Sequence, residues 1–255
     1  YVNDGFYTVA DFESFDSKSR TWKLKDGVVD SSPLSDTPRP GNAKFKKLTA
    51  IDPNSTNPYQ LTEADRTVIG NTTPKFSGGF GLNATYKGFD MSMFFNFMYD
   101  FDVLNANKIM LTTWADNKEN NFLMDIASDK RWRNFDDMGN EIRYSPEVLA
   151  EFNKNATMWN PTSIGRPICM SYAVEDGSFL RLNSATLGYT LPSVWTKKVG
   201  LSKVRFYVSG NNLFTLTGYS GYDPEVNIAT GLTPNIDYNR YPRSRTYTFG
   251  AQLTF

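Results

Sequence analysis

Residues 245–255 read RTYTFGAQLTF, and this stretch determines the class of fold that we expect. Every second residue from Tyr247 to Phe255 is apolar, and the residues between them are small or polar. Successive side chains of a β-strand point to opposite sides, so the alternation predicts one strand with two contrasting faces. An aromatic-rich face opposite small polar residues is typical of a strand between lipid and water. Ten residues tilted by about 45° span roughly 23 Å, which suits the apolar band of an outer-membrane strand.

Two further segments with the same alternation lie on either side of Lys87-Gly88. Residues 78–86 place Phe80, Leu82, Ala84 and Tyr86 on one face, opposite Gly79, Gly81, Asn83 and Thr85. Residues 89–99 return with aromatic residues and methionines on one face and Asp90, Ser92 and Asn96 on the other. Because Lys-Gly suits a tight turn, these segments predict a β-hairpin.

A third and a fourth region complete the expected set of strands. Residues 203–214 alternate without interruption. Residues 179–191 alternate in one phase only if a bulge near Asn183 is present, because Leu180 and Leu182 otherwise oppose the apolar residues that follow. The chain is therefore expected to be all-β, with five antiparallel strands.

The connections between these strands are alternately short and long. Residues 1–77, 100–178 and 215–244 are long, whereas the turns after residues 86 and 191 are short. Short turns on one side and long loops on the other are typical of bacterial outer-membrane barrels. If the C-terminus lies on the periplasmic side, the long segments are extracellular loops, and residues 78–255 hold the barrel strands. Within the second loop, Ser145-Pro146 resembles an N-cap followed by proline at the first helical position, which predicts a short helix to about Phe152.

Composition narrows the class of protein further. Aromatic residues make up 15% of the chain, and the formal net charge is zero, so no basic surplus favours nucleic acid as a partner. The longest apolar run is about three residues, against about 20 for a membrane helix, so only a β-barrel could place this chain in a membrane. Residues 1–10 lack the pattern of a signal peptide, and we expect any such peptide to be absent or already removed.

Catalysis, metal binding and cofactor binding are not expected. Histidine is absent, which excludes Ser-His-Asp catalysis and His-ligated metal sites. Asp223-Pro224-Glu225 has the paired carboxylates of a glycosidase, but the proline favours a turn-forming, loop-pinning role. Gly79-x-Gly81-x-x-Ala84 matches a loose dinucleotide fingerprint, yet these glycines lie inside a predicted strand, where we expect them to be small, lumen-facing positions. Cys169 is the single cysteine and is expected to be a small apolar filler.

Several runs of residues resemble one known family, the SusC/RagA-type TonB-dependent outer-membrane transporters. They follow the order of the late part of the barrel in that family, from about residue 60 to the end, which is about three quarters of the chain. Residues 1–59 and 100–173 match only loosely. The matching runs are DRTVIGNTTP (65–74), GGFG (78–81), YKGFD (86–90), VEDGSFLRL (174–182), LGYTLP (187–192), GNNLFTLT (210–217), GYDPE (221–225), YPRSR (241–245) and the terminal Phe255.

The resemblance implies the C-terminal part of a 22-stranded transmembrane β-barrel in the bacterial outer membrane, with a plugged lumen. It implies import of glycan or peptide fragments, a SusD-like surface lipoprotein as a lid, and the TonB complex as the source of energy. Five strands cannot close a barrel, so we expect the remaining strands, the plug and outer-membrane lipid as neighbours. Two alternatives stay open: a TonB-dependent receptor without a lid protein, and a secreted β-rich glycan-binding module.

Aromatic residues in the long loops are candidates for contact with substrate or partner, because aromatic rings suit both sugar faces and protein interfaces. Packing inside folded loops is the competing interpretation. The candidates are Trp114, Trp132, Trp159, Tyr219, Tyr222 and Tyr238.

Polar side chains on the strands are expected to face the lumen. These are Arg181, Arg205, Asn211 and Gln252. Two roles are open for the arginines and Asn211: lining the transport route, or pairing with carboxylates of the plug that the resemblance implies, which we favour. The same resemblance implies that the small residues Gly79 and Gly81 leave room for the plug. The terminal Phe255 resembles the barrel-assembly signal of outer-membrane strands, and it suits an aromatic girdle as well.

Overall fold

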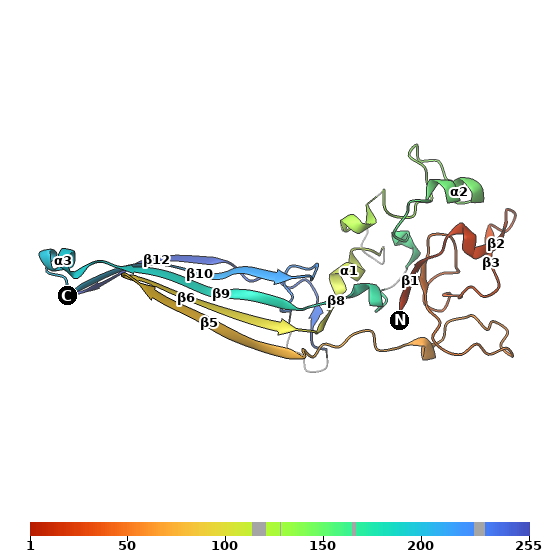
Figure 1. The fold of residues 1–255 in the computed structure, drawn as a ribbon. Helices are drawn as coiled ribbons and strands as arrows, with labels where there is room; N and C mark the ends of the chain where they lie inside the picture. Colours follow the sequence, from red (N-terminus) through yellow and green to blue (C-terminus); the bar gives the residue numbers. More distant parts are fainter. Residues whose placement is uncertain (114–120, 128, 165–166, 227–232) are drawn as a thin grey trace. The chain divides into compact units, whose positions relative to one another are not determined.

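The computed structural model falls into two compact units, which are described separately (Figure 1). Unit 1 consists of Tyr1–Ile69 and Asn105–Val174, and unit 2 consists of Gly70–Leu104 and Glu175–Phe255. The residues that the structure describes are 1–113, 121–127, 129–164, 167–226 and 233–255.

Unit 2 is built on a five-stranded antiparallel sheet with the strand order β12-β10-β9-β6-β5 (Figure 1). Each long strand pairs with the next one along the chain, so the sheet is a meander. The expected all-β fold of antiparallel strands is confirmed. The strands are β5 (Phe76–Tyr86), β6 (Phe89–Tyr99), β9 (Phe179–Thr190), β10 (Lys203–Thr217) and β12 (Thr246–Thr254).

A bulge at Asn183 sets the phase of β9, as its sequence predicted. Against β6, Ser184 pairs with Phe94 and Leu182 pairs with Phe95, so Asn183 is the extra residue. Residues paired directly across a sheet point to the same side. The bulge therefore brings Leu180 and Leu182 to the same face as Ala185 and Leu187.

The β5–β6 connection is the tight turn expected at Lys87-Gly88. Lys87 has φ +46° and Gly88 has φ +90°, so both central residues are in the left-handed region. A two-residue hairpin of the common primed type requires positive φ at both positions, and glycine adopts this without a Cβ penalty.

One face of the sheet is apolar and open to its surroundings. Phe80 stacks on Phe95 across β5 and β6, with ring centroids 4.9 Å apart. Large side chains on this face remain exposed, for example Phe249 at 77% and Phe206 at 51%. A sheet in water would bury such a face against another layer. Among the described residues of unit 2, no second layer covers it.

The opposite face is polar and is crossed by an ion pair. Arg205 on β10 donates to Asp90 on β6, with its Nε 2.9 Å from Oδ1 of Asp90. The two side chains meet above Gly188 on β9, because a Cβ built at Gly188 would lie 2.6 Å from both Arg205 Nε and Asp90 Oδ1. A side chain at position 188 would occupy the path of this ion pair.

We therefore expect Gly188→Ala to lower the free energy of unfolding by about 1–3 kcal/mol, the usual cost of overpacking. Urea denaturation of the protein measures the change. Gly81→Ala is the matched control, because a Cβ at Gly81 meets its nearest atom at 3.6 Å, an ordinary contact. Equal effects of the two substitutions would contradict the proposed role of Gly188.

The glycines of β5 lie against an aromatic ring of the adjacent strand. A Cβ at Gly79 would lie 2.8 Å from Cζ of Phe94, and one at Gly81 would lie 3.9 Å from Cδ2 of the same ring. The space above these glycines is thus taken by an aromatic ring of the adjacent strand. Such a ring covers exposed glycine backbone, a known way of stabilising edge strands.

Shorter elements follow the ends of the long strands in unit 2. The connection from β9 to β10 holds α3 (Ser193–Thr196) and η6 (Lys197–Val199). The strands β7 (Asp102–Asn105), β8 (Val174–Asp176) and β11 (Ile236–Asp237) form a separate sheet in the order β11-β7-β8. A small core gathers Phe101, Val103, Phe179, Tyr219 and Val226.

Unit 1 has little regular structure but well-defined cores. Strand β1 (Asn3–Phe6) pairs with β4 (Ala43–Phe45), and β2 (Phe12–Asp16) pairs with β3 (Thr21–Leu24). Its helical elements are α1 (Ala106–Met110), α2 (Pro146–Phe152), η1 (Val9–Asp11), η2 (Glu63–Asp65), η3 (Met124–Ile126), η4 (Pro161–Ser163) and η5 (Ser171–Ala173).

The short helix predicted in the second long segment is confirmed. Helix α2 begins at Pro146, with Ser145 as its N-cap residue, and ends at Phe152. The Ser145 side chain makes no capping hydrogen bond, so the start is set mainly by proline, whose fixed φ suits the first helical turn.

The segments expected to be separate loops share a hydrophobic core in unit 1. Phe45 and Leu61 from the first segment pack with Ile126, Trp159 and Met170 from the second. A second cluster contains Trp132, Ile142 and Leu149. Burial of this apolar surface stabilises a compact unit despite the irregular backbone. Among the described residues, no helix is both long and apolar enough to cross a membrane.

Asp65 organises the polar part of unit 1. This carboxylate is fully buried, and its oxygens accept hydrogen bonds from both Thr49 and Thr62 and from the backbone N–H of Leu48. Four of these donors lie 2.8 Å away, and Lys47 Nζ is 3.4 Å away. Burial alone would raise the pKa of Asp65, but hydrogen bonds to the charged form outweigh it and hold the pKa well below its usual range.

Candidate functional site

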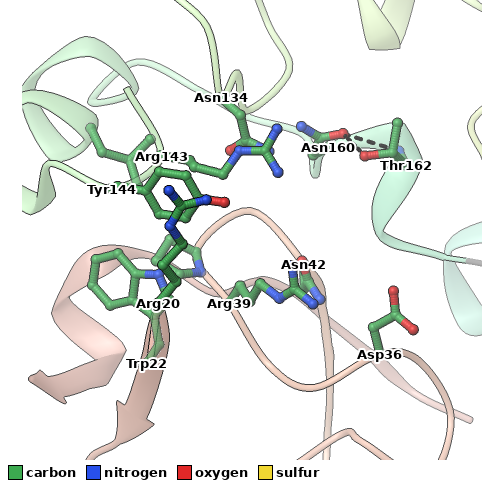
Figure 2. Close-up of a pocket in the computed structure, with 12 residues that line it drawn as sticks. Arg20, Trp22, Asp36, Arg39, Asn42, Asn134, Arg143, Tyr144, Asn160 and Thr162 are labelled. Atoms are coloured by element: carbon green, nitrogen blue, oxygen red, sulfur yellow. Dashed lines mark hydrogen bonds between the residues drawn. The ribbon is translucent and has the colours of Figure 1, made fainter. Parts of the chain in front are cut away.

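A polar pocket in unit 1 is the candidate site, and three arginines line it (Figure 2). Arg20 and Trp22 come from the β2–β3 hairpin, and Arg39 comes from the segment before β4. Arg143 and Tyr144 come from the segment before α2, more than a hundred residues away along the chain. The fold therefore brings the three guanidinium groups to one hollow from segments distant in sequence.

The charges in this pocket are not balanced within it. Asp36 is the one carboxylate among its lining residues. Arg143 forms an ion pair with Glu141, which lies outside the lining. For Arg20 and Arg39, no carboxylate of the described residues lies within 4.0 Å, the limit for an ion pair. Within the described part of the chain, two of the three guanidinium groups thus form no ion pair.

Aromatic rings support the arginines from one side. The guanidinium of Arg20 lies 4.7 Å from the centroid of Tyr144, and that of Arg143 lies 5.6 Å from the same ring. Phe15 packs on Tyr144 and on Trp22, with centroids 6.1 Å and 4.8 Å apart. Because Phe15 holds the Tyr144 ring in place, the two arginines over this ring have restricted positions.

Amide and hydroxyl groups complete the lining. The side-chain oxygen of Asn160 accepts hydrogen bonds from the backbone and the hydroxyl of Thr162, at 3.0 and 2.7 Å (Figure 2). Those contacts fix Asn160 at the start of η4. Asn42 is buried and donates to the carbonyl of Thr37. The pocket is therefore lined largely by groups that interact with polar ligands.

The loop aromatics expected from the sequence fall into two groups. Trp132, Trp159 and Tyr219 are buried in cores, where they pack rather than face solvent. Tyr222 and Tyr238 are exposed at 81% and 62%, so their rings are accessible to a ligand or partner. Trp114 lies outside the described residues.

The polar strand residues all lie on the polar face of the sheet. Arg205 pairs with Thr190 in register, Asn211 with Ser184 and Thr246, and Gln252 with Arg205. Both arginines have carboxylate partners within the chain: Asp90 for Arg205 and Asp223 for Arg181. Each of these charges thus has a partner within the chain. Phe255 is 90% exposed at the end of β12.

A buried charge network fixes the segment after β10. Arg181 is 1% exposed, and its Nη2 lies 2.5 Å from Asp223 Oδ1. Glu225 lies 3.7 Å from the same nitrogen and 2.6 Å from Arg243. The backbone N–H of Glu225 donates to Asp223 Oδ1 at 2.9 Å, which closes a turn around Pro224. The loop-pinning role expected for Asp223 and Glu225 is confirmed.

The charges in this network stabilise the ionised form of Asp223. Burial of Asp223 alone would raise its pKa, but the hydrogen bond from Arg181 and the nearby charges of Arg181 and Arg243 lower the pKa below its ordinary value. Nearby, Tyr219 donates to Asp237 at 2.7 Å, and burial and this carboxylate raise the pKa of Tyr219 far above its ordinary value. These groups hold the segment in place rather than carry out chemistry.

Sequence reasoning missed the pocket residues. Arg20, Arg39 and Arg143 have no common motif, and the aromatic residues that line the pocket beside them, Trp22 and Tyr144, were not among the predicted contacts. Within the described residues, no group of three or more His, Cys, Asp and Glu side chains could hold a metal ion.

Comparison with known proteins finds similar sequences among the TonB-dependent receptors. The TonB-dependent receptor P3 of Formosa agariphila is 35% identical over 202 residues, which cover 77% of this chain and 18% of that receptor. The TonB-dependent receptor SusC of Bacteroides thetaiotaomicron is 38% identical over 88 residues, which cover 33% of this chain and 8% of SusC. The chain thus spans less than a fifth of the length of these relatives. No protein-family model matches the chain.

The fold is also similar to that of a solved transporter. The structure of the RagAB peptide transporter matches 84% of this chain and 21% of the matched chain, with a TM-score of 0.55 and 24% identity. At this level of identity, the likeness concerns the fold alone. It supports the fold of antiparallel strands joined by long connections.

Proposed function

Because the chain belongs to the SusC/RagA type of TonB-dependent receptor, we propose that it forms part of the wall and the extracellular loops of an outer-membrane importer. The cargo in this proposal is a glycan or peptide nutrient. Unit 2 supplies wall strands, and unit 1 belongs to the loops on the outer side. The chain itself carries no chemical step in this scheme, and it works as part of the bacterial outer membrane.

The observation that supports this proposal best is the exposed apolar face of the five-stranded sheet. Phe249, Leu253 and Leu187 are each at least half exposed on it, although the opposite face carries an ion pair and hydroxyl groups. Lipid is the environment that makes such a face favourable, because acyl chains replace the missing second layer. The polar face then lines the water-filled and plug-filled interior.

The partners follow from the incomplete sheet and from the relatives. Strands β5 and β12 are the two edges of the sheet, and unpaired backbone groups at an edge cost several kcal/mol each in lipid. The remaining barrel strands and the plug would satisfy these edges. A SusD-like surface lipoprotein would deliver the nutrient, and the TonB complex would drive its passage.

Substitutions by arginine test the orientation of the sheet. At the centre of β12 we expect Phe249→Arg to cost about 2–4 kcal/mol of folding free energy, because it places a charge at the midplane of the bilayer. Leu253→Arg, near the end of the strand, should cost less, since the penalty falls to about 0–1 kcal/mol near the interface. Folding of the receptor into detergent or lipid, followed by the heat-dependent gel shift of closed barrels, measures these differences.

Thr248→Arg is the matched control, because Thr248 is the neighbour of Phe249 and points to the polar face. This substitution should be tolerated. If Thr248→Arg cost as much as Phe249→Arg, or if Phe249→Arg had no effect, lipid would not contact the apolar face.

Purification separates the remaining alternatives. A lipoprotein that copurifies with the receptor in mild detergent supports a lid-bearing transporter, and its absence favours a receptor that works without a lid. Partition of the protein into the aqueous phase without detergent would instead favour a secreted glycan-binding module.

A further inference from the structure

We propose that the arginine-lined pocket of unit 1 is a binding site for an oxyanion, that is, a carboxylate or sulfate group carried by a larger molecule. The site is formed by Arg20, Arg39 and Arg143 and does not involve the sheet of unit 2. This inference is independent of nutrient import, because it concerns binding at a single pocket.

The arrangement of charges is the first argument. Like charges close together repel, and a fold gains nothing by collecting them unless an opposite charge joins them. Glu141 compensates Arg143, whereas Arg20 and Arg39 lack a carboxylate partner among the described residues. Asp36 reduces the surplus but does not remove it. An anion in the pocket would supply the missing charge.

The chemistry of the donors is the second argument. A guanidinium group presents several N–H donors in one plane, a geometry that matches the oxygens of carboxylate and sulfate. Figure 2 shows the three arginine side chains around the pocket, with the amides of Asn134 and Asn160 beside Arg143. Stacking on Tyr144 restricts Arg20, so less conformational entropy is lost when it binds a ligand.

The size of the pocket defines how much of a ligand enters. Its volume is about 110 Å³, whereas pockets that enclose a whole small molecule have roughly 300–1,000 Å³. One charged group therefore fits, and the rest of the molecule stays outside. Arg39 is exposed, so a ligand can reach its side chain from solvent.

Arginine-selective modification tests this site in the intact receptor. Phenylglyoxal reacts with accessible guanidinium groups, and peptide mass spectrometry measures the rate at each arginine. Sodium sulfate and sodium acetate serve as probes, each compared with sodium chloride at the same ionic strength. At a probe concentration five times the dissociation constant, one-site mass action predicts about sixfold slower modification of Arg20 and Arg39.

Arg66 is the internal control, because it is exposed and pairs with Glu63 outside the pocket. Its modification rate should not depend on the anion. Protection of Arg20 and Arg39 by sulfate, acetate or both supports the proposal and identifies the preferred group. Equal slowing at Arg66, or the same slowing in chloride, would overturn it.

A variant gives a second, independent readout. Arg39→Gln removes one guanidinium group from an exposed position and should abolish most of the protection that sulfate or acetate gives to Arg20. Arg66→Gln makes the same change outside the pocket and should leave this protection intact. If Arg20 were protected equally in both variants, the three arginines would not form one site.

Discussion

Replacement of Arg181 by methionine is expected to destabilise unit 2 by about 3–5 kcal/mol, the usual result of removing one partner of a buried ion pair. The guanidinium is 1% exposed and is the partner of Asp223 at 2.5 Å. Without it, Asp223 must either stay charged without its main partner or take up a proton, because Arg181 is the main group that lowers the pKa of Asp223 against the effect of burial. The segment after β10 should then separate from β9, where Arg181 holds it.

Hydrogen–deuterium exchange measures this loss at the backbone N–H of Glu225, which donates to Asp223. A loss of about 3 kcal/mol corresponds to exchange that is faster by roughly 100-fold. Arg245→Met is the matched control, since Arg245 is exposed just before β12. A change below tenfold in Arg181→Met would contradict a stabilising role for the pair.

The double variant Arg181→Met with Asp223→Asn separates the ion pair from its surroundings. If most of the cost arises from an uncompensated charge, the double variant should be more stable than the sum of the two single effects predicts. Additive effects would indicate that each side chain acts through other contacts.

Replacement of Asp65 by asparagine is expected to have an effect of similar size on unit 1, about 3–5 kcal/mol. The carboxylate accepts hydrogen bonds from the backbone and hydroxyl groups of Thr49 and Thr62 and from Leu48 N–H. The amide group of asparagine cannot accept at both ends, and its NH₂ would face donors. Lys47, whose side chain is 9% exposed, would also lose its counter-charge.

Exchange of the Leu48, Thr49 and Thr62 amides reports this change directly, because all three donate to Asp65. We expect these amides to exchange roughly 100-fold faster in the variant. Asp52→Asn makes the same change at an exposed residue that accepts one backbone hydrogen bond, and should have little effect. Similar exchange rates in both variants would refute the role of Asp65.

The pH dependence of wild-type unit 1 follows from the same carboxylate. The folded pKa of Asp65 lies below its unfolded value, so the stability from ionised Asp65 is present above the unfolded pKa of about 3.9. It is lost as the pH falls through the lowered folded value. The three amides should therefore lose protection only on strong acidification, and Asp65→Asn should remove this dependence.

The long strands were predictable because apolar and polar residues alternate along the whole length of each strand. The imperfect phase of residues 179–191 even located the bulge at Asn183, since only an extra residue reconciles Leu182 with Leu187. Local chemistry was equally informative at Ser145-Pro146, where proline fixes the start of a helix. In these cases the structure depends on neighbours in sequence.

Unit 1 was not predictable in this way, because its core residues do not recur at a regular spacing in the sequence. Phe45, Leu61 and Ile126 lie in irregular segments that meet only in the fold. For the same reason the pocket was missed, since Arg20 and Arg143 come together across more than a hundred residues. The loop aromatics show a further limit. Tryptophan suits a ligand site and a core equally well, so residue type alone did not separate Trp159 from Tyr222.

The division of unit 1 into two sequence segments has a consequence for the order of folding. The chain leaves unit 1 after Ile69 and re-enters it at Asn105. Residues 70–104 between these points include the β5–β6 hairpin. Unit 1 therefore cannot complete its core until synthesis has passed the hairpin and reached residue 174. Once this core forms, it joins the two ends of the hairpin segment and removes the entropic cost of bringing them together. Completion of the core of unit 1 and registration of β5 against β6 are thus linked steps of one folding process.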